Sequence, residues 1–151
     1  MKTKKTRNGY TDTVKLLREC NAGIKMGEDA IKQVLPKAEN KELRRALEAC
    51  KDAHAALADE THSMLIRFGA NTKDPHPILR MMSGMKIKMR LSMRPTDTEI
   101  ADLMTDGCDM GIKSLHKYLN EYKGAVKDAR SIAGRIIASE EFLESGLRSY
   151  L

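Results

Sequence analysis

The residues of this sequence with the clearest chemical potential are cysteines, histidines and acids that recur at helical spacing. Cys50 and His54 are four residues apart, so on a helix they share one face. Thiolate, imidazole and carboxylate groups are the side-chain ligands that transition metals take in proteins, and thiols also carry redox chemistry. The candidate metal or redox residues are Cys20, Glu28, Cys50, His54, Cys108, His116 and Glu140.

The same residues also have a structural interpretation. Three cysteines are an odd number and match no Cys-x-x-Cys zinc pattern, so they are expected to be reduced thiols packed as small apolar side chains. His54 and Glu140 each lie on a line of apolar residues. Buried polar groups are costly unless paired, so we expect these two to meet each other or another polar group, or to lie at the rim of the core. Pairing is favoured over metal ligation.

Composition and length limit the class of protein. A chain of 151 residues with 4% aromatic residues and no Trp is typical of one all-α domain. No apolar run approaches the roughly 20 residues that span a bilayer, and the basic start lacks the apolar core of a signal peptide. The sequence therefore predicts a soluble, cytoplasmic protein. The net charge of +6 leaves an acidic partner open.

Four long amphipathic helices are predicted from apolar residues that recur every three or four positions. A first helix is expected to end before Pro36, a second to begin after Asn40 and end at Gly69, and a third to begin at Thr96 or Thr98. The expected ranges are 10–35, 41–68, 97–122 and 126–150. Short turns make each pair antiparallel, which gives two helical hairpins.

The two hairpins share a local sequence match. Cys20-Asn-Ala-Gly-Ile-Lys25 aligns with Cys108-Asp-Met-Gly-Ile-Lys113 at an offset of 88 residues, at similar depths in the first and third helices. This match indicates an internal duplication. The glycine pairs Gly23/Gly27 and Gly107/Gly111 are expected to allow close helix approach, because glycine within a helix costs about 1 kcal/mol.

Residues 70–95 connect the hairpins and hold five of the ten methionines. The connector is predicted to be partly helical, with Asp74 as N-cap and Pro75 at the first position, and to run the length of the bundle as a long crossover. In such a helix Ile78 shares a face with four methionines, while Ile87 and Leu91 lie on the other side. The interface candidates are Met82, Met85, Ile87, Met89, Leu91 and Met93.

The methionine face has three interpretations. The favoured one is that it fills the seam between the crossover and the bundle, as flexible core side chains. The second is a surface for a protein partner or an acidic membrane, since bases border it. The third, and the weakest, is Cu(I) binding through the thioethers.

A family resemblance rests on several short motifs in order. They are Leu35-Pro36, Lys41-Glu-Leu43, Arg67-Phe-Gly-Ala70, and Gly107-Cys-Asp109 followed by Leu115 and Tyr118. With the amphipathic crossover, they make the chain after residue 9 resemble small bacterial ferritin-like proteins known only as a domain of unknown function, distant relatives of ferritin and rubrerythrin. The resemblance implies a ferritin-like four-helix bundle and self-association as a homodimer or higher homo-oligomer.

An intact di-iron site is not expected within this resemblance. Such a site takes a Glu-x-x-His from each of two helices, and here the second helix has only Asp59-x-x-His62 while the last has no histidine. Where the family has Gly-Glu-Asp, this chain has Cys108 in the middle position. We therefore expect no cofactor, the alternative being iron or another transition metal on the candidate ligands named above.

Three classes of function remain open at this point. The favoured one is a non-enzymatic structural or interaction protein, since no complete catalytic motif is present. The second is a degenerate metal or redox protein. The third is nucleic-acid binding through a disordered basic tail over residues 1–9, with candidate residues Lys2, Lys4, Lys5 and Arg7. No aromatic residues interleave with these bases, so base recognition is not expected.

Overall fold

The fold is all-helical, as predicted. The computed structural model describes residues 2–72 and 74–151, and the side chains of residues 2–7 are outside that description. No strand occurs among the described residues. The elements in chain order are α1 (Lys2–Val34), η1 (Leu35–Lys37), α2 (Lys41–Arg67), α3 (Pro77–Met93), α4 (Asp97–Glu121), α5 (Lys127–Leu147) and η2 (Arg148–Tyr150).

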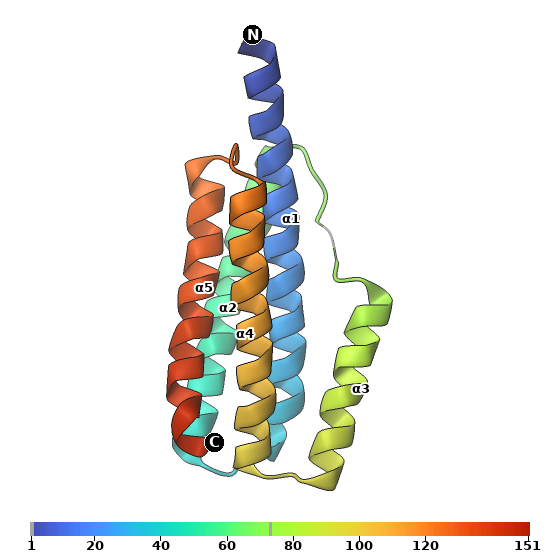
Figure 1. The fold of residues 1–151 in the computed structure, drawn as a ribbon, viewed down its shortest axis with the longest axis vertical. Helices are drawn as coiled ribbons and strands as arrows, with labels where there is room; N and C mark the ends of the chain where they lie inside the picture. Colours follow the sequence, from blue (N-terminus) through green and yellow to red (C-terminus); the bar gives the residue numbers. More distant parts are fainter. Residues whose placement is uncertain (1, 73) are drawn as a thin grey trace.

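Four long helices pack side by side, and the fifth lies outside them (Figure 1). α1, α2, α4 and α5 form the bundle, while α3 runs along its outside against α1 and α4. The connection through α3 returns the chain to the end of the bundle where α2 began. α4 therefore runs in the same direction as α2, which a short turn would not allow.

Capping residues define the helix ends. Asn40 Oδ1 accepts hydrogen bonds from the backbone N–H groups of Glu42 and Leu43, so this predicted cap is confirmed. Thr96 caps α4 through the N–H of Glu99. Gly69 ends α2 with a φ of 68°, the left-handed conformation that favours glycine.

Two predicted helix starts differ from the structure. α3 begins at Pro77 with His76 as its N-cap, not at Asp74 and Pro75. α1 begins at Lys2, so residues 2–9, expected to be a disordered tail, are its first turns. Within α1, a Cβ at Gly9 would lie 3.3 Å from the carbonyl oxygen of Gly124, in the turn between α4 and α5. Glycine at this position therefore allows that turn to approach α1 closely.

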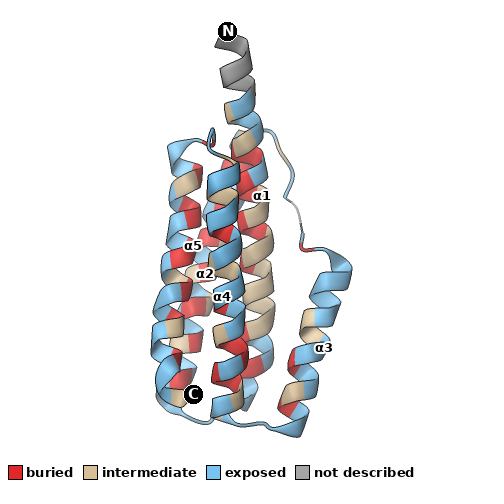
Figure 2. Cartoon of the chain, viewed as in Figure 1, coloured by how far each residue is buried: buried red, intermediate tan, exposed pale blue. Residues whose placement is uncertain are grey.

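The apolar lines predicted from the sequence form the core (Figure 2). In α2 the residues that recur at helical spacing from Leu43 to Met64 are all buried: Leu43, Leu47, Cys50, His54, Leu57, Thr61 and Met64. In α4 the same spacing includes the buried residues Ile100, Met104 and Leu115, but Gly107 within it is exposed. Helical periodicity thus identified most of the bundle's interior.

The crossover helix faces the bundle with the side opposite to the one expected. Ile87 and Leu91 are buried, at 8% and 5% exposure, whereas Met85 is 63% exposed. The favoured interpretation of the methionine face as core is therefore wrong. Arg90 lies beside Ile87 and Leu91 on the bundle side of α3 and pairs with Glu99 and Asp102 of α4. These ion pairs and the two branched side chains hold this side of α3 against the bundle.

Replacing Ile87 by alanine should loosen α3, whereas Met85→Ala should not. Truncating a buried isoleucine costs about 2–5 kcal/mol in a closed core and less at an edge, while an exposed substitution stays within about 0.5 kcal/mol. Amide hydrogen exchange along Pro77–Met93 measures the difference. Equal acceleration of exchange in the two variants would contradict this orientation of α3.

Candidate functional site

A buried pair of polar side chains lies within the bundle. His54 of α2 is 1% exposed and Glu140 of α5 is 7% exposed. Their Nε2 and Oε1 atoms are 3.7 Å apart. The Nδ1 of His54 lies 3.0 Å from the carbonyl oxygen of Cys50, which can only accept, so Nδ1 carries a proton. Of the arrangements expected for these two residues, the structure shows mutual pairing.

Two glycines on the facing helices make room for this pair. A Cβ at Gly27 of α1 would lie 3.0 Å from His54 Nε2. A Cβ at Gly111 of α4 would lie 2.7 Å from Glu140 Oε1 and closer still to Oε2. The other members of the glycine pairs, Gly23 and Gly107, have no atom within 4 Å of such a Cβ, so the close-approach prediction is wrong for them.

The pair is an ionic one. Burial alone would lower the pKa of His54, but its hydrogen bonds with Cys50 and Glu140 outweigh burial and raise that pKa to about 10. This raised pKa favours the imidazolium form of His54 at neutral pH. Glu140 Oε2 is buried without a hydrogen-bond partner, so the arrangement ties α2 to α5 at some cost in free energy.

Two of the cysteines, Cys20 and Cys108, lie in surroundings that keep them protonated. All three are free and buried. Burial, and secondarily the charge of Glu19, raises the pKa of Cys20 to about 12. Burial and then the charge of Glu140 raise the pKa of Cys108. Because the thiolate is both the nucleophile and the metal ligand, these raised pKa values work against redox or metal chemistry at Cys20 and Cys108.

The structure gathers only part of the predicted ligand set. Cys50 Sγ lies 3.6 Å from His54 Nδ1 and 3.7 Å from Ser139 Oγ, so Cys50, His54 and Glu140 form one cluster. His116 is exposed and Glu28 is half-buried. Among the described residues, no group of three or more His, Cys, Asp or Glu side chains is arranged to hold a metal ion. The side chains of Lys2, Lys4, Lys5 and Arg7 lie outside the described part of the chain.

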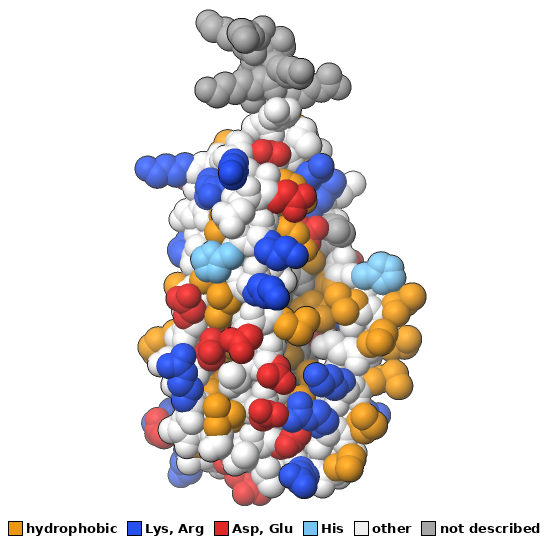
Figure 3. Space-filling model, viewed as in Figure 1, with side chains coloured by type: hydrophobic (Ala, Val, Ile, Leu, Met, Phe, Trp, Pro, Cys, Tyr) orange, Lys and Arg blue, Asp and Glu red, His pale blue; other side chains and the backbone are white. Residues whose placement is uncertain are grey.

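The outward face of α3 is the second feature of note. Seven large apolar side chains on it are between 54% and 77% exposed, and we name them the Met stripe: Ile78, Leu79, Met81, Met82, Met85, Met89 and Met93. Figure 3 shows apolar side chains gathered along this edge of the molecule. Of the predicted interface candidates, the four methionines belong to the stripe, while Ile87 and Leu91 are buried against the bundle.

Leu79 and Met81 were not among the sequence-based candidates. Both are exposed, at 54% and 60%, and both border the line of spacing 78, 82, 85, 89 on the helix surface. The sequence pattern identified only a narrow line of residues along α3. The exposed face is wider because α3 contacts the bundle along only one side. Position on the helical surface was the signal that could have found them.

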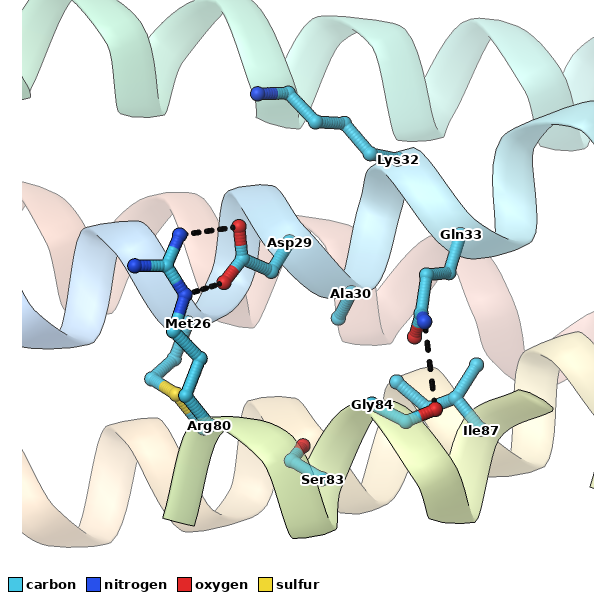
Figure 4. Close-up of a pocket in the computed structure, with 9 residues that line it drawn as sticks. All are labelled: Met26, Asp29, Ala30, Lys32, Gln33, Arg80, Ser83, Gly84 and Ile87. Atoms are coloured by element: carbon cyan, nitrogen blue, oxygen red, sulfur yellow. Dashed lines mark hydrogen bonds and ion pairs between the residues drawn. The ribbon is translucent and has the colours of Figure 1, made fainter. Parts of the chain in front are cut away.

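Polar contacts attach α3 to α1, in addition to the ion pairs of Arg90 with α4. Arg80 pairs with Asp29 of α1, and Gln33 Nε2 donates to the carbonyl oxygen of Gly84 over 3.3 Å (Figure 4). These contacts border a groove of about 290 Å³ between α1 and α3, with Ile87 among the residues that line it. The groove lies on the bundle side of α3, opposite the Met stripe.

Comparison with known proteins identifies the fold alone. No protein-family model matches the sequence, and no curated protein matches it either. One solved structure, a DUF305 fragment from Deinococcus radiodurans, superposes with a TM-score of 0.71 over 91% of this chain and 93% of that one, at 12% identity. The two chains share a fold. DUF305 is a family of unknown function, in line with the domain of unknown function that the sequence resembles.

None of the described helices is both long enough and apolar enough to cross a bilayer.

Alanine at Gly111 should destabilise the protein, whereas alanine at Gly107 should stabilise it. Gly111→Ala places a methyl group where the Glu140 carboxylate lies and so forces the ion pair with His54 apart, which should cost about 1–3 kcal/mol. Gly107→Ala meets open space and removes a helix-interior glycine, worth up to about 1 kcal/mol. Chemical denaturation measures the free energy of unfolding of each variant. A stabilising Gly111→Ala would contradict the proposed role of the glycine.

Proposed function

We propose that this chain is a non-enzymatic interaction protein, in which the bundle is a scaffold and α3 is the element that binds another protein chain. The observation that carries the proposal is the exposed Met stripe. Soluble monomers rarely expose a contiguous apolar patch of more than a few hundred Å², and larger ones mark interaction sites. Seven large apolar side chains, each more than half exposed, gather on one face of α3.

The interior of the bundle supports the same proposal. Its polar cluster of Cys50, His54 and Glu140 is flanked by Gly27 and Gly111, where a Cβ would lie 3.0 Å from His54 Nε2 and 2.7 Å from Glu140 Oε1. A catalytic group has to reach a substrate, and His54 is 1% exposed. The cluster is better suited to fixing the packing of the helices than to chemistry. We also propose a ferritin-like origin without an intact di-iron site, supported by the long crossover and the small ligand set.

The energetics favour an occupied stripe. Fully burying a methionine, leucine or isoleucine side chain contributes about 1.5–3 kcal/mol. Covering several members of the Met stripe would therefore offset a substantial part of the 4–15 kcal/mol that association costs. The occupant is either a second copy of this chain, in line with the self-association that the family resemblance implies, or a different protein.

Photo-crosslinking inside the producing cell tests the proposal. A photoreactive phenylalanine analogue at Met85 or Met89 should give a discrete covalent adduct, either a homodimer or a heterodimer. The same analogue at Met110 of α4 or Phe142 of α5, which are 67% and 78% exposed, is the matched control and should give none. Absence of adducts from the stripe, or equal yields at the control positions, would contradict the proposal.

A further inference from the structure

We propose that the Met stripe binds an amphipathic helix of another protein whose apolar face is bordered by acidic side chains. This inference rests on the proposed function and names the class of partner. It starts from the geometry of α3, a helix of 17 residues that is open along its outer face. Ile78, Met82, Met85 and Met89 follow the alternating four-and-three spacing of a seam between two helices.

The side chains of the stripe suit a helical partner. Methionine is unbranched and polarisable, so it adapts to the ridges of a second helix, and it recurs on surfaces that bind amphipathic helices. The stripe has no aromatic residue, whereas helices that lie in a membrane interface use Trp, Phe and Leu on the apolar face. The composition of the stripe therefore favours a helix over a lipid surface.

The charged residues of α3 specify the sign of the charge that the partner should carry. Residues 77–93 contain no Asp or Glu. Arg80 and Arg90 are engaged by acids of the bundle, whereas Lys86 and Lys88 are exposed and make no ion pair within the described part of the chain. At 100° per residue these two lysines are 200° apart, so they lie on opposite borders of the stripe. A partner with acids on both borders of its apolar face complements them.

A second copy of this chain fits less well. Pairing the stripe of one copy with that of another places Lys86 and Lys88 beside the lysines of the other helix, with no acid from either α3. Like charges at these border positions are destabilising in helix pairs. An anionic membrane also fits less well. Lipid-binding segments gather about 4–8 bases, but two of the four bases of α3, Arg80 and Arg90, are already paired with acids of the bundle, and the exposed acids Asp102 and Asp106 lie beside Arg90.

Two synthetic peptides test the inference on the full chain. Both are fluorescein-labelled 18-residue helices with a Leu/Met face; one has glutamates on both borders of that face and the other has lysines. Fluorescence anisotropy should show the glutamate peptide binding at least about tenfold more tightly, as expected from two partly exposed ion pairs, with the difference shrinking in high salt. Met85→Glu should abolish binding, and the control Met110→Glu should not.

Charge reversal makes the test sharper. The double variant Lys86→Glu/Lys88→Glu keeps the apolar stripe and should prefer the lysine peptide. Circular dichroism establishes that each variant keeps its helix content. Equal affinity of wild type for the two peptides, or a preference that does not reverse, would overturn the inference.

Other outcomes separate this inference from the proposed function. If neither peptide binds but the chain forms a dimer that Met85→Glu dissociates in sedimentation, the docking role of α3 stands and the acidic helix is overturned. Met85-dependent binding to phosphatidylserine vesicles in place of the peptides overturns it in favour of a membrane surface. Failure of peptides, vesicles and self-association together, with no crosslinks from the stripe, overturns both.

Discussion

The pairing of Arg90 with the acids of α4 determines which side of α3 meets the bundle. Arg90 contacts Glu99 and Asp102 and lies 4.0 Å from Asp106, and only a quarter of its side chain is exposed. Guanidinium–carboxylate bonds are directional, so they fix the rotation of the helix about its axis as well as its position. Ile87 and Leu91, one turn apart, then fall into contact with the core. The methionines are left on the outside because α3 packs against α1 and α4 along one side only.

The interior of the bundle accommodates two polar side chains. The side chains of His54 and Glu140 are buried where four helices meet, and each needs space that side chains on α1 and α4 would otherwise occupy. Gly27 and Gly111 provide that space at the cost of helix propensity. Buried ion pairs contribute little net stability, but an unpaired partner is strongly destabilising. The pair therefore disfavours other registers of α2 against α5, which is a role in the specificity of folding.

Much of the bundle could be predicted from the sequence because periodicity reports burial directly. The line from Leu43 to Met64, the cap at Asn40 and the long crossover all follow from local rules. The orientation of α3 could not be predicted in this way. Its two faces are both apolar, and the choice between them depends on Arg90 meeting Glu99 and Asp102, residues of the next helix. The start of α1 was missed for a similar reason, because the contact of Gly9 is with Gly124, a residue distant in sequence in the turn between α4 and α5.

The same distinction applies to the candidate site: local spacing predicted some of its features, and contacts between helices determined the others. Spacing alone placed His54 and Glu140 on buried lines, and mutual pairing followed from the cost of burial. Spacing could not show that Gly23 and Gly107 face open space while Gly27 and Gly111 do not, since that depends on which residue of a facing helix lies opposite.

The outward orientation of the α3 methionines is tested directly by NMR of ¹³C-labelled methionine methyl groups. A soluble nitroxide broadens the signals of methyl groups that it can approach. We expect strong broadening for Met81, Met82, Met85, Met89 and Met93 in dilute protein, and little for Met64 and Met104, which are 6% and 5% exposed. Protection of the α3 methyl groups comparable to that of Met64 and Met104 would contradict this orientation.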